Sequence, residues 1–259
     1  MAKPVHFFLL PHQDDEFGVF YLIENVIERG HRPVCLFMTD GGYDGVEPAT
    51  RDDESRYVLG ALGVQAPDIR FLGSDHGLPD GQLAALLPDA FAHLKKTADE
   101  FGPPDFVYIP AWEGGHQDHD ATHILGIAAA ESWGVRDRLR QFPLYNAYRC
   151  GLRPYRVLAP IVENGPAEAM PIPVARWMRY LRLCLSYRSQ RKTFAGLLPL
   201  MAAHYALRGV QNLQQVSSAR VRERPHQGAL LYERFRKTSF EELKKPLDIF
   251  FDAHAAVNS

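Results

Sequence analysis

The sequence predicts an α/β protein with a Rossmann-like, mostly parallel sheet and helices on both faces of that sheet. Three observations lead to this prediction. In the first half of the chain short apolar runs alternate with segments of helical periodicity, the connections between them are short, and the most polar clusters directly follow the apolar runs. Ligands of such sheets bind outside the carboxyl ends of the strands, so these clusters mark the expected site.

Each expected element has its own signal. Short apolar runs suit strands that are buried on both faces, at 5–10, 33–38, 69–72 and 106–109. Apolar residues at helical spacing predict helices over about 17–29, 51–62, 82–101 and 119–133. The first two helices end at Gly30 and Gly63, since glycine favours the C-terminal cap of a helix. Residues 151–174 are rich in proline, and we expect a less regular C-terminal part.

The composition excludes several classes of protein. The 259 residues include 29 Lys+Arg and 31 Asp+Glu, and the net charge of -2 excludes a strong global attraction to nucleic acid. Three widely spaced cysteines fit neither a disulfide framework nor a CxxC metal site, which favours a reducing compartment. The apolar run 5–10 is followed at once by polar residues, and no later stretch has the length of a membrane span. We therefore expect a cytoplasmic protein without a signal peptide.

Two polar clusters are candidates for chemistry. The first, His12-Gln13-Asp14-Asp15-Glu16, follows the first strand, and a histidine and a carboxylate three residues apart can converge on one metal ion. Imidazole with carboxylate suits Zn2+, and the adjacent Asp14 would remain free to act on water. The second cluster, residues 114–120, follows the fourth strand and can supply a third ligand and a second catalytic imidazole.

Each cluster also has a simpler interpretation. Taken alone, the first is more often a helix start with acidic residues in its first turn, and the second is more often a solvated loop. Their joint occurrence at the ends of two predicted parallel strands favours a site.

Seven segments resemble the PIG-L/LmbE family of zinc-dependent N-acetyl-sugar deacetylases. The family includes N-acetylglucosaminyl-phosphatidylinositol de-N-acetylase-like enzymes and deacetylases of the mycothiol and bacillithiol pathways. Its (A/P)HPDDE and HPDH motifs appear at 11–16 and 116–119, with Gln13 and Gln117 in place of the usual prolines. The other matching segments are Thr39-Asp40-Gly41, Arg51-Asp52-Asp53-Glu54, Phe71-Leu72-Gly73, Pro79-Asp80-Gly81 and Tyr187-Arg188-Ser189-Gln190. The match is good over about residues 5–130 and weak from 140 onward.

The resemblance implies a metal site and a reaction. His12, Asp15 and His119 would bind one Zn2+ per chain, which keeps an open position for water and lowers the pKa of that water to about 7. The reaction implied is removal of an N-acetyl or related N-acyl group from an amino-sugar conjugate.

The resemblance also implies the catalytic residues. Asp14 would be the general base that takes a proton from water activated by the metal and passes it to the leaving amine. His116, in its protonated form, would stabilise the oxyanion, and Asp118 would orient this imidazole.

Three further residues are candidates for substrate binding, each with a simpler alternative. Arg51 binds the sugar or a nearby phosphate by the resemblance, or forms a surface ion pair with Glu54 or Glu47. Asp80 could accept sugar hydroxyls or serve only as a turn residue. Trp112 could stack on a sugar ring at the rim of the site, or belong to the core.

A basic segment follows in the second half of the chain. There is no acidic residue from 169 to 221, and Arg176, Arg179 and Arg182 recur every three residues between apolar ones. The pattern predicts either a surface helix with a solvated basic face or a contact with an anionic partner. In the second case residues 176–192 would contact a membrane surface or a phosphate-bearing substrate, such as a nucleotide- or lipid-linked sugar.

Other functions compete with the deacetylase hypothesis. His116, Asp118 and the distant His226 form the HxD…H pattern of a non-haem Fe(II) oxygenase, although that chemistry usually lies on an all-β fold. A non-catalytic sugar- or membrane-binding protein is a third hypothesis. In each case we expect one domain over 1–259, with a core and metal site in 1–140 and a C-terminal extension in 141–259 that completes the cleft. The sequence predicts no nucleic-acid partner and leaves open a homo-oligomer.

Overall fold

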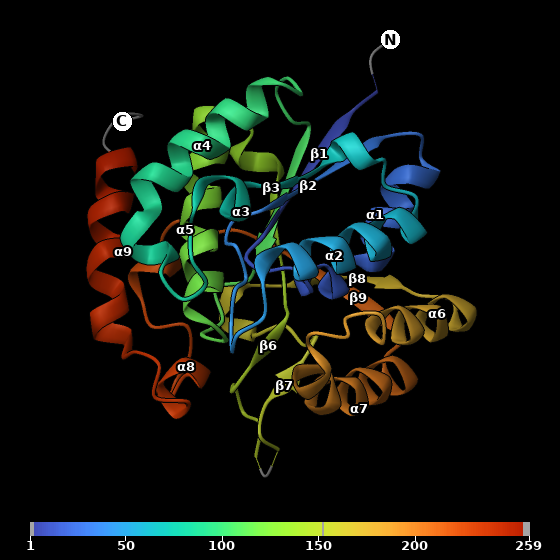
Figure 1. The fold of residues 1–259 in the computed structure, drawn as a ribbon. Helices are drawn as coiled ribbons and strands as arrows, with labels where there is room; N and C mark the ends of the chain where they lie inside the picture. The colour runs from blue at the N-terminus through green and yellow to red at the C-terminus, as the bar shows by residue number, and fades with distance from the viewer. Residues whose placement is uncertain (1–2, 152, 256–259) are drawn as a thin grey trace.

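The computed structural model describes residues 3–151 and 153–255, and Figure 1 shows how their helices and strands are arranged. The strands are β1 (Val5–Leu10), β2 (Arg32–Phe37), β3 (Ile69–Phe71), β4 (Phe106–Pro110), β5 (Leu139–Phe142), β6 (Tyr145–Asn146), β7 (Arg156–Val157), β8 (Ala167–Pro171) and β9 (Val210–Gln215). The helices are α1 (Phe20–Glu28), α2 (Pro48–Leu62), α3 (Leu72–His76), α4 (Leu87–Asp99), α5 (Gln117–Ser132), α6 (Val174–Cys184), α7 (Arg191–Leu207), α8 (Leu231–Arg234) and α9 (Phe240–Ala255).

The four predicted strands are present, each within one residue of its expected bounds. The four predicted helices are present too, but two of them begin later than expected. Short 3-10 turns at Asp15–Gly18 and Leu83–Leu86 precede α1 and α4 and take up the first residues of both predicted helices. The first of these turns begins with Asp15 and Glu16, the last two residues of the polar cluster that follows β1.

The central sheet has the strand order β3-β2-β1-β4-β5-β9-β8. Strands β1 to β5 are parallel to their neighbours, while β9 and β8 join antiparallel at one edge. The predicted fold class, a mostly parallel α/β sheet, is confirmed. Because β2 and β4 lie on opposite sides of β1, the strand order reverses there, and a crevice forms outside the carboxyl ends of β1 and β4.

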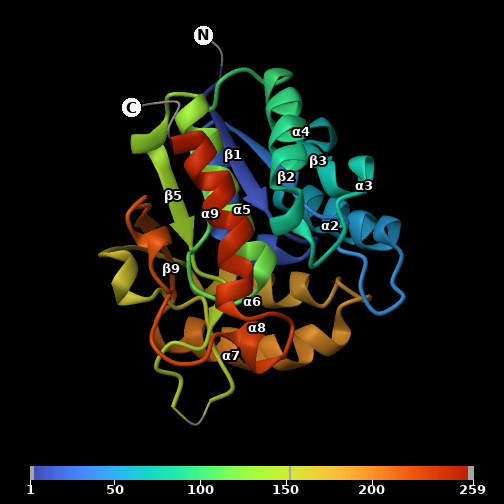
Figure 2. The same ribbon diagram turned by 90° about the vertical axis from the view of Figure 1, so that its left-hand side faces the viewer.

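Side chains of β1 alternate between two hydrophobic layers. Phe7 and Leu9 pack with α4, α5 and α9 on one face, and Phe8 and Leu10 pack with α1, α2, α6 and α7 on the other. The two views in Figures 1 and 2 show these helices on either side of the sheet. All four side chains are fully buried, and each such burial contributes about 1.5–3 kcal/mol. This packing holds the ends of β1 and β4 at fixed positions.

The C-terminal part of the chain is more regular than its prolines suggest. Residues 151–174 were expected to be irregular, but β8 lies within them and pairs with β9 along its whole length. Prolines are tolerated there because β8 is an edge strand, where one side needs no ladder hydrogen bonds. Among the described residues no helix is both long and apolar enough to cross a membrane.

Candidate metal centre and active site

A cavity of about 660 Å3 opens at the carboxyl ends of β1 and β4, at the crevice where the strand order reverses. Six of the nine predicted site residues line it: His12, Asp14, Asp15, Arg51, Asp80 and His116. The rest of its wall comes mostly from later parts of the chain, and includes Tyr145, Tyr155, Leu197, Leu231, Tyr232 and Phe235. The cavity therefore joins a cluster of histidines and carboxylates to a wall that mixes aromatic, apolar and polar side chains.

The turn after β1 brings a histidine and a carboxylate together. His12 Nδ1 lies 3.1 Å from Asp15 Oδ2, and the His12 N–H also donates to this oxygen at 3.0 Å. On the far side of the carboxylate, His119 Nε2 lies 3.2 Å from the same Asp15 oxygen. Asp15 thus joins two imidazoles that are 107 positions apart in the sequence.

Burial and the neighbouring charges have opposite effects on the pKa values of Asp15 and His12. Burial alone would raise the pKa of Asp15, but His119 and His12 hold it well below its usual range. Burial would lower the pKa of His12, and the carboxylates of Asp80, Asp118 and Asp15 outweigh that effect and raise it. The carboxylates around His12 therefore create a negative environment, which favours either a proton on His12 or a bound cation in place of that proton.

The donor set and its spacing fit a metal ion. Tetrahedral zinc ligands, each about 2.0–2.2 Å from the ion, lie about 3.3–3.6 Å from one another. The contacts of Asp15 with the two imidazoles, at 3.1 and 3.2 Å, are close to that range. Ring nitrogens of His12, His116 and His119 also lie within 4.8 Å of one another. Within the described residues, the buried His119 Nδ1 has no hydrogen-bond partner. The cluster can bind a metal.

His116 begins α5 and caps it with its own ring. Its Nδ1 accepts the Asp118 N–H at 3.2 Å, so the proton of the neutral imidazole is on Nε2, the nitrogen 3.9 Å from Asp80 Oδ1. Burial and the neighbouring His12 lower the pKa of His116 to about 4. This differs from the expected protonated imidazole, because a buried ring at a helix N-terminus disfavours a second proton.

Asp118 has a different partner from the one expected. Its carboxylate is 3.9 Å from His116 Nδ1, too far for a hydrogen bond, but Oδ2 lies 3.1 Å from His12 Nε2. The same carboxylate accepts the N–H groups of Gly81 at 2.6 Å and Leu83 at 3.1 Å. Asp118 therefore orients His12 and fixes the loop that carries Asp80, because this loop crosses the start of α5.

Arg51 is buried and makes neither of the ion pairs considered from the sequence. Its Nη2 donates to the Gln13 carbonyl and lies 3.3 Å from Asp14 Oδ2, while Nη1 donates to the Gly41 carbonyl. Burial raises the pKa of Asp14, and the Arg51 guanidinium opposes this. Arg51 lines the cavity, and its Nη1 also lies 3.9 Å from Asp80 Oδ2, so the guanidinium joins the turn around Asp14 to the loop that carries Asp80.

The suggestion that Trp112 stacks on a substrate is wrong. Trp112 follows β4, is 1% exposed, and packs into the hydrophobic layer that contains α5 and α9. Its Nε1–H donates to the Glu223 carbonyl, and the ring does not line the cavity. The alternative interpretation, a core aromatic, is the one the structure supports.

Tyr145 lines the cavity and was missed from the sequence. Its hydroxyl lies 3.5 Å from His119 Nε2, and its ring centroid is 5.1 Å from that imidazole. Glu113 fixes this segment: its Oε1 accepts the N–H groups of Leu144 at 2.7 Å and Tyr145 at 3.0 Å. No short motif surrounds Tyr145, so the sequence carries little signal for it.

His226 does not join His116 and Asp118. Its Nδ1 contacts the carbonyl of Gln227, and its ring lies against Tyr148. Among the described residues two groups of side chains could hold a metal, and His226 is in neither: His12, His116 and His119, or His12, Asp80, His116 and Asp118. The structure therefore lacks both features that the oxygenase hypothesis requires: His226 does not lie with the other two ligands, and the fold is not all-β.

The basic segment is paired with acidic residues of α1. Arg179 donates to Glu24, and Arg176 donates to Glu28 and lies near Glu24, so α6 is fixed to α1 by charge pairs. Arg182 is exposed. Neither sequence interpretation included these pairs, because their acidic partners precede the arginines by about 150 residues.

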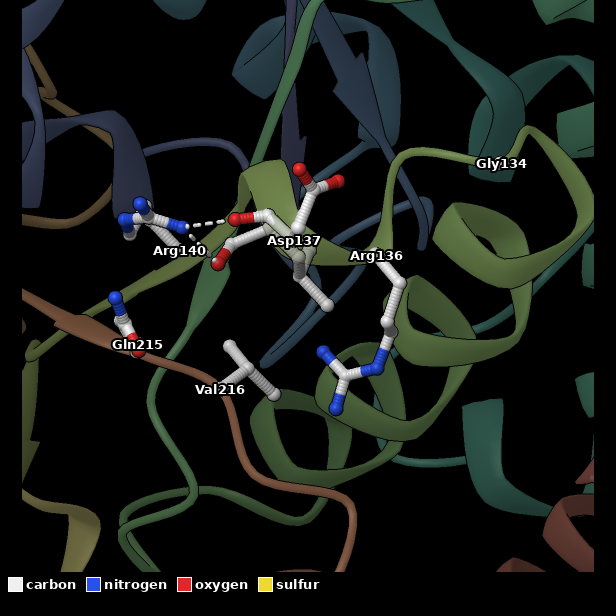
Figure 3. A pocket seen from close by; sticks show the side chains of 7 residues that line it. Gly134, Arg136, Asp137, Arg140, Gln215 and Val216 are labelled. Atoms are coloured by element: carbon white, nitrogen blue, oxygen red, sulfur yellow. Dashed lines mark hydrogen bonds between the residues drawn. The ribbon is translucent and has the colours of Figure 1, made fainter.

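A second hollow, of about 530 Å3, opens at the opposite, amino end of the parallel strands, beside the start of β5 (Figure 3). Its two arginines already have protein partners: Arg140 donates to two backbone carbonyls, and Arg136 contacts Glu131 at 3.0 Å and donates to Ser218 at 2.7 Å. None of the predicted site residues lines this hollow.

Comparisons with known proteins agree with this geometry. Residues 7–130 match the family model described as PIG-L: GlcNAc-PI de-N-acetylase. A search of curated proteins found no match.

Several solved structures are similar in fold. Teicoplanin deacetylase Orf2 in its zinc-inhibited form has a TM-score of 0.62 and 14% identity, covering 82% of this chain and 98% of that one. The conserved protein TT1542 from Thermus thermophilus has a TM-score of 0.57 and 23% identity, covering 82% and 94%. N,N'-diacetylchitobiose deacetylase from Pyrococcus horikoshii has a TM-score of 0.51 and 19% identity, covering 83% of each chain. Residues 7–130 thus carry a PIG-L family domain, and this match together with the deacetylases of similar fold supports a deacetylase, a hydrolase that acts on N-acetyl amides.

Proposed function

We propose that the protein is a zinc-dependent hydrolase that removes an N-acetyl or related N-acyl group from an amino-sugar conjugate. The observation that carries the proposal is the convergence of His12, Asp15 and His119 beside the Asp14 carboxyl, in a cavity large enough for a small-molecule substrate. The family match and the deacetylases of similar fold support the same reaction class.

His12, Asp15 and His119 would hold one zinc ion per chain, because carboxylate and imidazole suit zinc and three protein ligands leave a position open. When bound, zinc would supply Lewis-acid chemistry and make water more acidic. Asp118 would keep the His12 imidazole oriented through its 3.1 Å contact with Nε2.

Asp14 would act as the general base. Its carboxyl lines the cavity beside the ligand Asp15 but contacts Arg51 instead of the two ligand histidines. Burial, which raises its pKa, favours a carboxylate that takes a proton from water and later gives it to the leaving amine. An amide requires this second transfer, since the amine leaves as a neutral group only when its nitrogen is protonated.

His116 would stabilise the oxyanion as a neutral donor. Its Nδ1 is occupied by the Asp118 N–H, so the free Nε2–H can donate to the acyl oxygen as negative charge develops there. A pKa near 4 keeps the imidazole neutral at the pH where the base is active.

The sugar would lie toward Asp80 and Arg51, whose polar atoms face the inner cavity. Asp80 Oδ1 is 3.5 Å from His12 Nε2, so its other acceptor sites can serve sugar hydroxyls. The remainder of a conjugate would extend outward between Tyr43, Phe235 and the rim lysines Lys192 and Lys237. A phosphate or lipid portion of the conjugate is compatible with that mixed lining.

We also propose that residues 1–259 act as one catalytic unit in the cytoplasm. The support is that α7 and α8 contribute to the cavity wall, while β9 and β8 extend the same sheet that carries His12. The core proposed over 1–140 would then hold the metal, and residues 141–259 would complete the cleft.

The test is release of free amine from a panel of N-acetylglucosamine conjugates that are free, nucleotide-linked, lipid-linked or thiol-linked. Elemental analysis of the same preparation should find about one zinc per chain. His119→Ala should lower the zinc content and the rate together. Hydrolysis of none of these conjugates by a zinc-loaded enzyme, or full zinc retention in His119→Ala, would contradict the proposal.

A further inference from the structure

Asp14 has a backbone conformation that residues other than glycine rarely adopt. Its φ is 124° and its ψ is -22°, and it lies in the turn that the His12 carbonyl closes by accepting the Asp15 N–H at 3.2 Å. Asparagine and aspartate tolerate positive φ better than most residues, but the conformation persists only where the surroundings fix it. This turn sets the direction of the Asp14 side chain, which is the proposed general base.

The Gln13–Asp14 peptide is held at both of its ends. The Gln13 carbonyl accepts a hydrogen bond from Arg51 Nη2, and the Asp14 N–H donates to Glu16 Oε2 at 2.8 Å. Arg51 is 3% exposed and Glu16 is fully buried, so water does not compete for either bond. Rotation of this peptide, which would release the positive φ, has to break both.

Glu16 is in turn surrounded by hydroxyls from distant elements. Burial raises the pKa of the Glu16 carboxyl, and the nearby hydroxyls of Ser55 in α2 and of Tyr187, which follows α6, oppose this rise. Both hydroxyls and Glu16 Oε1 are buried and have no hydrogen bond within the described residues, so no other protein group competes for them. Tyr187 is 1% exposed and stacks on Phe194 of α7, with ring centroids 5.1 Å apart and planes at 8°. Its ring therefore has little freedom to leave Glu16.

The segment that carries Tyr187 is anchored separately to α2. The Ser189 N–H donates to Glu54 Oε1 at 2.9 Å, and the Ser189 hydroxyl donates to Glu54 Oε2 at 2.6 Å. The C-terminal half of the chain thus reaches the turn after β1 through Tyr187 and Glu16.

We propose that Glu16 is a positioning residue that holds Asp14 in its left-handed conformation, and that Tyr187 holds Glu16 in place. The inference rests on the proposed function only in taking Asp14 as the base. A glutamate that merely started a helix would interact with the helix dipole and would have no effect on the φ of Asp14.

The chain offers a matched control pair. Glu24 is also buried, and it accepts a hydrogen bond from Tyr180, a buried tyrosine of α6. This pair resembles Glu16 and Tyr187 in burial and residue types, but neither member contacts the turn around Asp14. Glu24 differs in that it also pairs with Arg176 and Arg179. Substitutions of Glu24 and Tyr180 therefore measure the general effect on kcat of losing a buried glutamate or a buried hydroxyl.

The kinetic experiment compares Glu16→Ala with Glu24→Ala, each measured per zinc-bound chain. Glu16→Ala should lower kcat about 10- to 100-fold with KM nearly unchanged, because the base is misplaced while the sugar contacts remain. Glu16→Gln should recover most of this loss, since its amide oxygen can accept the same N–H. Tyr187→Phe should lower kcat by a smaller factor, and Tyr180→Phe should not.

A structural readout keeps the test independent of catalysis. Crystal structures should show Asp14 at positive φ in the wild type and in Glu24→Ala, and at negative φ in Glu16→Ala. Positive φ in Glu16→Ala, wild-type kcat in that variant, or an equal loss in Glu24→Ala would overturn the proposal. If Glu16→Ala does not fold, kcat and the φ of Asp14 are compared in Tyr187→Phe and Tyr180→Phe instead. Equal values in these two variants would then overturn the proposal. A wild type that hydrolyses no conjugate refutes the proposed function, while the φ comparison still decides the role of Glu16.

Discussion

The buried Glu113 should make the free energy of unfolding depend on pH. Glu113→Gln should remove this dependence. Its side chain is fully buried, and burial raises its pKa from 4.5 to about 7. The folded protein then binds this proton more tightly than the unfolded chain. Between these two pKa values stability falls as pH rises, by at most about 1.4 kcal/mol per pH unit and about 3 kcal/mol in total.

Glu113→Gln removes the titrating group but also one acceptor. Glu113 Oε2 accepts the Asn146 side-chain N–H at 2.8 Å, and an amide nitrogen at that position would face another donor. At pH 5 the variant should therefore be less stable than the wild type by about 1–3 kcal/mol. By pH 8 the difference should shrink or reverse, because the wild type has lost its proton-linked stabilisation and the variant has none to lose.

The assay is urea unfolding of both proteins at pH 5, 6, 7 and 8, with Glu241→Gln on an exposed position of α9 as the control. Buried carboxyls that are not coupled to Glu113 titrate equally in wild type and variant, so they cancel in the difference between the two unfolding free energies. Asp120 is the exception, because the charge of Glu113 contributes to its raised pKa. A difference that stays constant from pH 5 to pH 8 would refute the argument that burial perturbs Glu113.

Two further changes test other parts of the structure. Gly73→Ala should lower the unfolding free energy by at least about 3 kcal/mol, because the added Cβ would overlap the Thr39 backbone; an unchanged urea midpoint would contradict that close approach. Arg179→Gln should cost about 1 kcal/mol or less, and the loss should shrink at high salt, because the partly exposed Arg179 pairs with Glu24. Sedimentation with anionic vesicles should not change in Arg179→Gln, and reduced binding would instead support the membrane interpretation of this segment.

Local patterns were sufficient to predict the parallel sheet and the inner end of the site. The apolar runs of β1 and β4 are buried on both faces, so they stand out in the sequence, and each is followed at once by its polar cluster. Because the ends of neighbouring parallel strands meet, His12 and His119 could be expected to converge without knowledge of any contact.

Features that depend on distant pairing could not be predicted in this way. Trp112 comes just after a strand end and could equally face the rim or the core, and only the position of α9 decides that it is buried. Arg176 and Arg179 form a basic pattern whose acidic partners lie on α1. Tyr145 reaches His119 from a two-residue strand that carries no periodic signal.

The central claim is the division of work between two adjacent aspartates, with Asp15 as a metal ligand and Asp14 as the base. Asp14→Asn keeps the size of the side chain and tolerates the positive φ, but cannot accept a proton at neutral pH. The most direct test measures zinc content and deacetylation rate side by side in Asp14→Asn and Asp15→Asn. Asp14→Asn should retain its zinc and lose about 100- to 10,000-fold in turnover, which is roughly 3–5 kcal/mol of barrier. Asp15→Asn should lose zinc affinity, with activity partly restored at high zinc. Wild-type turnover in Asp14→Asn, or loss of zinc from that variant instead of Asp15→Asn, would contradict the assignment.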